Sequence, residues 1–413
     1  MIVVAGVSHR MAPLAFRERC AVPAEAQDGV RAALAQRFGA CMLLSTCGRT
    51  ELYTDAAEAD APAAAAALAA WLAARAGAAP PSATTLIETA SGDDALRRLL
   101  RVACGLDSAL EGEDEILGQV RRAWLGAGLA GTLTPALDAA CRLAVRTGRR
   151  ARRQESGQAW TSLADWAAAR IAGVVEGQRR PRVLVAGTGP MGLRAAETLR
   201  GRFGGALDLT LAGRTLAHVT AHAARFDARP VLLAALPVVL CRADAAVVAL
   251  RTRTPLIDAH SVCPRPPERP LVLVDLSLPR AVDTSVGCLA NVTLVDLDSL
   301  AESAQGASRW DSEGRANVER LVEDAVQAFA MQSERSETAE TLTTLRIQAD
   351  RIRRSQLART FRRLPHLDPE TRWAVDAMTR AIVNRLLHSP TQRLKGESAD
   401  EDAARIRRLF GFE

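Results

Sequence analysis

The stretch RVLVAGTGPMGLRAAETLRGRF, residues 182–203, decides the fold of the central part of the chain. An apolar run typical of a buried strand leads directly into a G-x-G-x-x-G turn and then into a helical pattern. The first glycine permits a tight turn, the second lets a pyrophosphate approach the backbone, and the third allows close helix–strand packing. The start of the helix faces the anion. The stretch therefore predicts a dinucleotide site at Gly187, Thr188, Gly189, Pro190, Met191 and Gly192.

The surrounding sequence extends this unit into a parallel sheet. Five strand-like runs, RVLVAG, LDLTLAG, DAAVVAL, LVLVDLS and NVTLVDL, alternate with helix-compatible segments between residues 181 and 298. Such alternation predicts a doubly wound α/β domain, and in that context a glycine turn that binds nothing is the weaker alternative. The second run ends in LAGRT, where Arg214 stands 27 residues after Gly187 and no acidic residue is present. We therefore expect NADPH rather than NADH, with Arg214 pairing with the 2′-phosphate.

Two further regions flank this domain. Residues 1–155 mix short strand-like runs with alanine-rich helical segments, which predicts an α+β domain with helices on a small sheet. Residues 306–413 show no convincing strand, and their long helical patterns carry apolar stripes that need a partner. We expect an N-terminal α+β catalytic domain, a Rossmann-type NADP domain at 156–305 that starts with a long linking helix from near Thr161, and a C-terminal all-helical dimerisation domain.

Composition excludes several classes of protein. Hydrophobic residues make up 48% and charged residues 24% of the chain, as in ordinary globular proteins. Lys395 is the only lysine, which argues against a Schiff-base lysine and a P-loop nucleotide site. We see no signal peptide and no convincing membrane span, so we expect a cytoplasmic protein without membrane contact. The eight cysteines have neither the spacing of a zinc site nor that of a disulfide framework, and we expect no metal.

One basic segment indicates an anionic partner. The stretch CRLAVRTGRRARRQ, residues 141–154, holds six arginines and no acidic residue. Arg142, Arg146, Arg149 and Arg153 recur at helical spacing and would share one helix face. That face has the size of an electrostatic footprint for phosphates. A solvated helix surface explains it equally well.

Cys47 is the cysteine whose sequence neighbours are compatible with a nucleophilic role. It follows the strand-like run MLLST and begins the turn CGRT, residues 47–50, so we expect it at an exposed strand end. Arg49 and the amides of the turn would favour its thiolate. A nucleophilic cysteine beside a nicotinamide cofactor predicts reduction of a thioester to an aldehyde, or the reverse oxidation. On spacing alone, an inert turn cysteine is an equally open alternative.

Several blocks distributed along the whole chain resemble glutamyl-tRNA reductase. They are GVSHRMAPLAFRERCAVP, LLSTCGRTELY, RVACGLDSALEGEDEILGQVRRAW, LVDLSLPRAVD, NVTLVDLDSL and NRLLHSPTQRLK. The resemblance implies the NADPH-dependent reduction of glutamyl-tRNA(Glu) to glutamate-1-semialdehyde, the first step of 5-aminolevulinate and tetrapyrrole biosynthesis. It also implies a homodimer formed through the C-terminal helices, with the downstream semialdehyde aminotransferase as a candidate further partner.

By position, the resemblance makes Cys47 the nucleophile that releases tRNA and holds glutamate as a thioester. It assigns the substrate pocket to Thr46, Gly48, Arg49, Ser108, Glu113, Asp114, Glu115 and Gln119. We expect Arg49 to clamp a substrate carboxylate in bidentate fashion. The arginine-rich face would then contact the nucleic acid.

The sequence departs from the family pattern inside this pocket. Gly48 replaces the family's asparagine, and Arg98 stands ten residues before Ser108, where a histidine is usual. Arg98 would act as a catalytic residue by stabilising an oxyanion, because an arginine cannot exchange a proton near neutral pH. We expect the nearby His9 to be structural. The family's G-E-P-Q reads GEDE at 112–115, and the added carboxylates would repel an anionic substrate unless they are paired with arginine or protonated.

Functions of different classes therefore remain open. The first is an active reductase with an altered pocket. The second is a catalytically impaired paralogue that acts as an NADP- or tRNA-binding regulatory protein. Retention of Cys47, Arg49, Ser108, Gln119 and the three motif glycines favours the first. A dehydrogenase for a free small aldehyde is a weaker third hypothesis.

Overall fold

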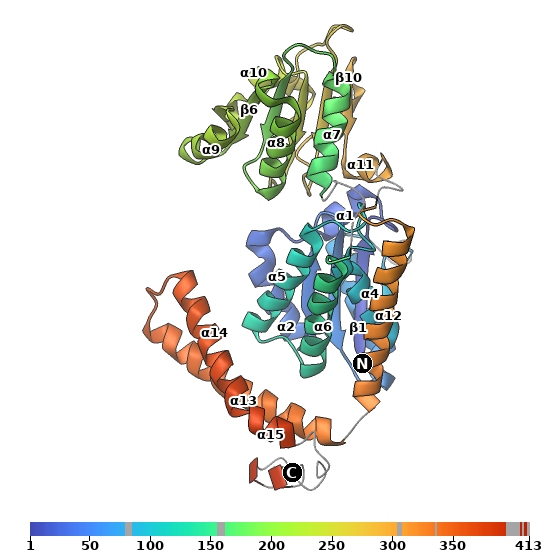
Figure 1. The fold of residues 1–413 in the computed structure, drawn as a ribbon, viewed down its shortest axis with the longest axis vertical. Coiled ribbons are helices and arrows are strands. Elements are labelled where there is room, and N and C mark those ends of the chain that lie inside the picture. The colour runs from blue at the N-terminus through green and yellow to red at the C-terminus, as the bar shows by residue number, and fades with distance from the viewer. Residues whose placement is uncertain are drawn as a thin grey trace.

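The computed structural model describes residues 1–78, 85–154, 162–303, 308–334, 337–393, 405–406 and 409–410. Figure 1 shows the parts along the long axis of the molecule: a sheet covered by helices at one end, the N-terminal domain in the middle, and long helices at the other end. The predicted fold class is confirmed: an α+β N-terminal domain, a Rossmann-type domain and a helical C-terminal region.

The N-terminal domain is built on a four-stranded antiparallel sheet of order β2-β3-β1-β4. Its strands are β1 (Ile2–Ser8), β2 (Met42–Ser45), β3 (Arg49–Asp55) and β4 (Glu88–Ser91). Ser8 pairs with Arg49 in register, so the turn that carries Cys47 lies where β1 ends. The helices are α1 (Leu14–Cys20), α2 (Gln27–Phe38), α3 (Ala61–Arg75), α4 (Gly92–Cys104), α5 (Glu115–Ala130) and α6 (Pro135–Ala151).

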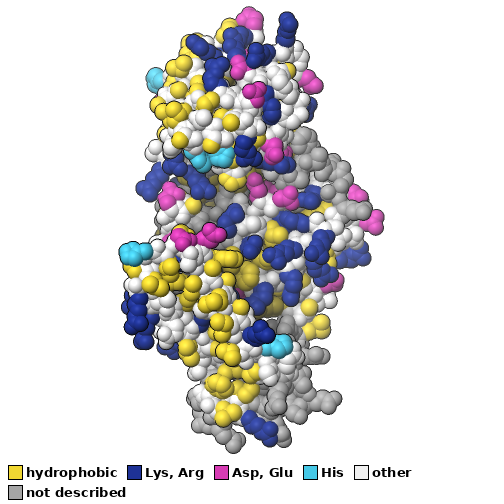
Figure 2. Space-filling model, turned by 60° about the vertical axis from the view of Figure 1, so that its left-hand side comes forward, with side chains coloured by type: hydrophobic (Ala, Val, Ile, Leu, Met, Phe, Trp, Pro, Cys, Tyr) yellow, Lys and Arg dark blue, Asp and Glu magenta, His cyan; other side chains and the backbone are white. Residues whose placement is uncertain are grey.

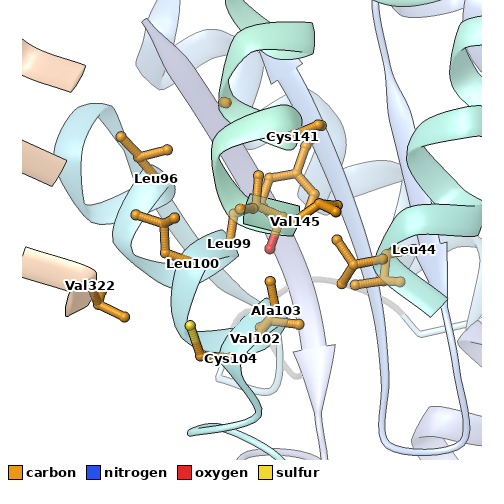
Figure 3. Close-up of a cluster of buried hydrophobic side chains, with 14 of the residues drawn as sticks. Leu44, Leu96, Leu99, Leu100, Val102, Ala103, Cys104, Cys141, Val145 and Val322 are labelled. Carbon is orange, nitrogen blue, oxygen red and sulfur yellow. The ribbon is translucent and has the colours of Figure 1, made fainter. Parts of the chain in front are cut away.

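The core of this domain forms where α4, α5 and α6 meet one face of the sheet. Figure 3 shows Leu99 of α4 and Val145 of α6 close together, with Leu44 of β2 on the far side. Full burial of each such large aliphatic side chain contributes roughly 1.5–3 kcal/mol. The helix α12 (Ser312–Glu334) adds Val322 to the same core. One apolar stripe of the C-terminal region is therefore covered within the chain.

The second domain is a six-stranded parallel sheet of order β10-β9-β8-β5-β6-β7. Its strands are β5 (Arg182–Ala186), β6 (Asp208–Gly213), β7 (Arg229–Leu232), β8 (Ala245–Val248), β9 (Leu271–Asp275) and β10 (Val292–Val295). The helices are α7 (Leu163–Val175), α8 (Pro190–Phe203), α9 (Leu216–Ala223), α10 (Leu236–Leu240) and α11 (Leu297–Ser303). Strand β7 is not apparent from the sequence, because this edge strand has no fully buried residue and contains Pro230.

We expected a long linking helix to begin near Thr161. Thr161 is outside the described residues, and the helix that follows it, α7, is 13 residues long and packs on α8 within the dinucleotide domain. The long helix α12 packs along α4 and α6 of the N-terminal domain. Later in the chain come α13 (Glu337–Arg363), α14 (Pro369–Leu386) and α15 (His388–Arg393). Helical periodicity alone does not show where a helix packs, so the linking helix that we expected from near Thr161 stays a prediction.

Two further findings concern cysteines and membranes. Cys241 and Cys263 form a disulfide with 5.1 Å between their Cα atoms, a single bond that the spacing of the cysteines did not indicate. A separation of 22 residues matches no disulfide scaffold, and only the fold brings the two loops together. None of the helices among the described residues is long and apolar enough to cross a bilayer.

Candidate active site

The N-terminal domain faces the carboxyl edge of the parallel sheet. Leu14 and Leu110 belong to the same buried cluster as the core of the dinucleotide domain. Polar contacts reinforce this interface: the Leu14 amide donates to Asp298 Oδ2 at 2.7 Å, and Arg280 Nε donates to Glu18 Oε1 at 2.9 Å. Buried Arg17 also pairs with Asp298. The two domains therefore form a continuous packed unit around the edge where β5 ends.

The glycine turn after β5 has the geometry that a dinucleotide requires. Gly187 has φ +120°, and a Cβ there would lie 2.2 Å from the Ala249 carbonyl oxygen. A Cβ on Gly192 would lie 2.1 Å from the Gly187 carbonyl oxygen, whereas a Cβ on Gly189 would have no neighbour within 4 Å. Two glycines are thus required by packing, and the third leaves open space at the start of α8. The residues present fit a bound pyrophosphate.

The Cys47 turn packs against this part of the dinucleotide domain. Cys47 is half-buried and contacts the apolar cluster to which Met191 and Leu193 of α8 and Leu278 also contribute. Its carbonyl oxygen accepts a hydrogen bond of 2.8 Å from Arg17 Nη1. Cys47 of the N-terminal domain therefore packs against the core of the domain that carries the glycine turn.

The expectation of an exposed Cys47 with a favoured thiolate is wrong for this arrangement of the domains. Burial, together with the charges of Glu113 and Glu115, raises the pKa of the Cys47 thiol to about 12 against the opposing charge of Arg17. The amides of Gly48 and Arg49 do not stabilise the sulfur, because both donate to Thr46 Oγ1 at 3.2 Å, and the backbone hydrogen bond of Cys47 itself is the smallest of the effects on its pKa. Cys47 is therefore a thiol here, and an attack on a carbonyl requires a base.

A cavity of about 380 Å³ opens between the domains. Asp114 and Glu115 line one side, and Pro190, Leu193 and Arg194 of α8 line the other. The remaining lining residues are Ser162, Glu197, Arg225 and Phe226. Of the pocket residues that the resemblance assigned, only Asp114 and Glu115 line this cavity. Ser108 is buried, and Gln119 is half-buried one turn after Glu115 on α5.

Comparison with known proteins identifies the family. The model of the glutamyl-tRNA(Glu) reductase N-terminal domain matches residues 5–155, and that of the dimerisation domain matches residues 317–412. Glutamyl-tRNA reductase of Rubrobacter xylanophilus is 36% identical over 99% of this chain and 96% of its own, and that of Syntrophotalea carbinolica is 32% identical over 99% and 94%. The chain belongs to the glutamyl-tRNA reductase family. It is an oxidoreductase.

Other matches concern the middle domain and a solved structure. The shikimate/quinate 5-dehydrogenase model matches residues 168–303. Together with the family, this match indicates a nicotinamide dinucleotide as the cofactor. A solved glutamyl-tRNA reductase from Methanopyrus kandleri has 25% identity and a TM-score of 0.44 over 98% of each chain.

Two arginines that the family pattern placed in the pocket are held by a buried carboxylate. Glu51 is fully buried in β3, with Arg49 Nη1 at 3.2 Å and Arg98 Nη2 at 2.9 Å. Arg49 Nη2 also donates to the Asp107 carbonyl oxygen, and Arg98 pairs with Glu88 at 3.0 Å. Neither arginine is therefore free to act as we expected, Arg49 as a bidentate clamp and Arg98 as an oxyanion stabiliser.

Sequence reasoning missed Glu51, although an acidic residue inside the strand-like run TELY was a usable signal. Burial alone would raise the pKa of Glu51, but Arg98, Arg49 and the Tyr53 hydroxyl, which donates at 2.7 Å, lower it overall. Gly6 on the paired strand leaves the room for this cluster, because a Cβ there would lie 2.6 Å from Glu51 Cγ. Glu51 is thus an ionised structural partner of both arginines.

The imidazole of His9 is neutral at physiological pH. Burial and the charges of Arg49, Arg17 and Arg10 lower the pKa of His9 to about 4, so its ring is neutral. Its backbone N–H donates to the Gly48 carbonyl oxygen at 2.9 Å. This contact fits the structural role that we expected.

The carboxylates of the segment GEDE, residues 112–115, would repel an anionic substrate unless they are paired with arginine or protonated, and the structure shows an example of each. Asp114 pairs with Arg309 at 2.6 Å and lies 3.6 Å from Arg152 Nε. Burial raises the pKa of Glu113, and burial together with Glu113 and Asp165 raises the pKa of Glu115 to about 7, against Arg122 and Arg194. One added carboxylate is therefore paired with arginine, and the pKa of the other is raised toward neutral pH.

Within the described residues, no group of three or more histidine, cysteine or acidic side chains is placed to hold a metal ion. Arg214 is exposed directly after β6 and has no ion-pair partner in the described part of the chain. Its guanidinium is therefore available to an anion at the edge of the dinucleotide site.

Proposed function

We propose that this protein reduces glutamyl-tRNA(Glu) to glutamate-1-semialdehyde with NADPH, the first step of 5-aminolevulinate biosynthesis, through a thioester on Cys47. The observation that carries the proposal is the packing of Cys47 against the core of the domain that carries the G-x-G-x-x-G turn. The test is incubation of purified protein with glutamate-labelled glutamyl-tRNA. Labelled acyl-enzyme should accumulate without NADPH, and labelled aldehyde should appear with it. A wild-type protein that forms neither supports the regulatory paralogue instead.

The chemistry divides into acyl transfer and reduction. In the first, a bond forms between the Cys47 sulfur and the ester carbonyl carbon, the bond to the ribose oxygen breaks, and that oxygen takes a proton. Bound NADPH would supply the hydride that reduces the thioester. Release of the aldehyde then breaks the carbon–sulfur bond, and the sulfur regains a proton. Each half of the reaction therefore needs a group that moves a proton at Cys47.

We assign that proton transfer to Glu115. Arg17 and Arg49 cannot exchange protons near neutral pH, and His9 has a pKa of about 4. The charges of Glu113 and Glu115 both raise the pKa of the Cys47 thiol. Glu115 also lines the interdomain cavity, and its pKa of about 7 suits a group that must alternately accept and donate a proton.

Replacing Glu115 by glutamine should lower kcat for acyl-enzyme formation about 100-fold. In the wild type the carboxylate base is present above pH 7 and is lost as the pH falls through that value, because its pKa is about 7. The wild-type rate should therefore decrease below pH 7, and the rate of the variant should not show this decrease. Glu197→Gln, which alters another carboxylate of the same cavity, is the matched control and should retain the decrease. A variant with the wild-type profile would contradict the assignment.

NADPH specificity is assigned to Arg214. Its exposed guanidinium follows β6, where the adenosine ribose of a dinucleotide is read in this fold. Arg214→Ser should raise KM for NADPH roughly 10- to 100-fold and leave KM for NADH almost unchanged, since one charged hydrogen-bonding partner is lost. Arg202→Ser at the far end of α8 is the control. Equal effects on both cofactors would refute the assignment.

The proposal includes a homodimer formed through the C-terminal helices. Trp373, Met378, Ile382 and Leu386 of α14 are exposed in the single chain, with 51% to 71% of each side chain accessible. Figure 2 shows hydrophobic side chains gathered over this end of the molecule. Exposed apolar surface of this kind is typical of a protein interface, and the dimerisation-domain model covers it.

A further inference from the structure

A second cavity, of about 250 Å³, lies between α5 and α6. Three arginines line it: Arg121 from α5, Arg149 from α6, and Arg152 directly after α6. Asp114, Leu117, Gly118 and Val145 complete the lining. A groove with three guanidinium groups and one carboxylate carries a net positive charge, and its ligand is therefore an anion.

The charge continues along α6 beyond this groove. Arg146, Arg149, Arg150 and Arg153 are exposed, and within the described residues none of them, nor Arg121, has an ion-pair partner. Arg142 is the exception, since it pairs with Asp138. Figure 2 shows arginine side chains gathered at mid-height on this side of the molecule, above the C-terminal helices. Unpaired guanidinium groups repel one another, so an extended polyanion would be stabilised there.

The groove also joins the proposed active site. Asp114 lines both cavities. Arg152 Nη2 donates to the carbonyl oxygens of Glu113 and Asp114 at 2.8 and 3.3 Å, and its Nε is buried without a hydrogen-bond partner. The groove therefore leads from the open face of α6 to the segment that holds Glu115.

We propose that the groove between α5 and α6, together with the arginine face formed by Arg146, Arg149 and Arg153, binds the phosphate backbone of the RNA that delivers the glutamyl group. The 3′ end of that RNA points past Asp114 into the interdomain cavity. This inference rests on the proposed function, because it takes the substrate to be an aminoacylated RNA. Arginine is the side chain best suited to bind phosphate oxygens in bidentate fashion.

The test measures binding of fluorescently labelled, uncharged tRNA(Glu) to the full-length protein at several KCl concentrations. The variant Arg146→Gln/Arg149→Gln should bind roughly 20-fold more weakly near physiological salt, and its slope of log K against log[KCl] should be shallower by about 2, as expected for two lost phosphate contacts. The matched control is Arg202→Gln/Arg242→Gln, which removes two exposed arginines at the amino edge of the parallel sheet. This control should bind tRNA with the wild-type affinity and salt slope.

A second measurement separates this inference from the proposed function. Reduction of a small glutamyl thioester by NADPH should proceed equally well in the wild type and the double variant, because no RNA is present. A wild type that does not reduce the thioester refutes the function and leaves the RNA surface standing. The proposed RNA surface is overturned if the double variant binds tRNA with the wild-type affinity and salt slope. It is also overturned if the double variant loses only binding to acidic phospholipid vesicles and keeps binding to tRNA. If the double variant does not fold, each single variant should show about half the change in slope.

Discussion

Replacing Cys47 by serine should abolish both the labelled acyl-enzyme and the aldehyde, a loss of about 1,000-fold or more in kcat. A hydroxyl is a much weaker nucleophile than a sulfur, and His9, whose backbone contacts this turn, cannot activate it well because the pKa of its ring is about 4. The measurement is a single turnover with labelled glutamyl-tRNA, followed by separation of protein-bound label from free aldehyde. NADPH binding should be unchanged, because Cys47 lies outside the glycine turn.

The matched control is Cys288→Ser. Cys288 is a free and exposed cysteine of the dinucleotide domain. Its variant should keep the wild-type yield of acyl-enzyme and aldehyde, which would show that the effect at position 47 is not a general effect of removing a thiol. Full aldehyde production by the Cys47→Ser variant would exclude a thioester route.

The glycine turn could be predicted from the sequence because its geometry is local. The strand, the three glycines and the first turn of α8 are contiguous, and steric limits on a Cβ at Gly187 and Gly192 follow from contacts within about five residues and with one adjacent strand. The parallel sheet could be predicted for the same reason, since each buried strand forms its own apolar run. Strand β7 was missed because it is short and only half-buried.

The state of Cys47 could not be predicted in this way. The apolar cluster that it packs against includes residues of α8 more than 140 positions away in the sequence, and burial raises the pKa of its thiol. The positions of Arg49 and Arg98 show the same limit. A family pattern can assign both to a substrate pocket, but the register of β1 against β3 and the missing side chain of Gly6 bring both to Glu51 instead.

The largest effect on stability is expected for Glu51→Gln. The substitution preserves shape but leaves Arg49 and Arg98 without their shared buried counter-charge, so we expect the free energy of unfolding to fall by about 3–5 kcal/mol in urea titrations at pH 7. The pKa of Glu51 is lowered in the folded protein, so its contribution is present above the unfolded value of about 4.3 and is lost as the pH falls through the folded value. The difference between variant and wild type should therefore shrink in acid.

Glu88 provides the matched control, because it is the partner of Arg98 at the exposed rim of the same cluster, with 41% of its side chain accessible. Glu88→Gln should cost less than about 1 kcal/mol, since water screens an exposed pair. Adding Arg98→Met to Glu51→Gln removes one of the uncompensated charges and should restore part of the lost stability, because the penalty comes from the unpaired buried guanidinium rather than from the loss of an attraction. Additive losses in the double variant would mean that Glu51 and Arg98 stabilise the domain independently, and the cluster would then not be the reason why an arginine is held at position 98.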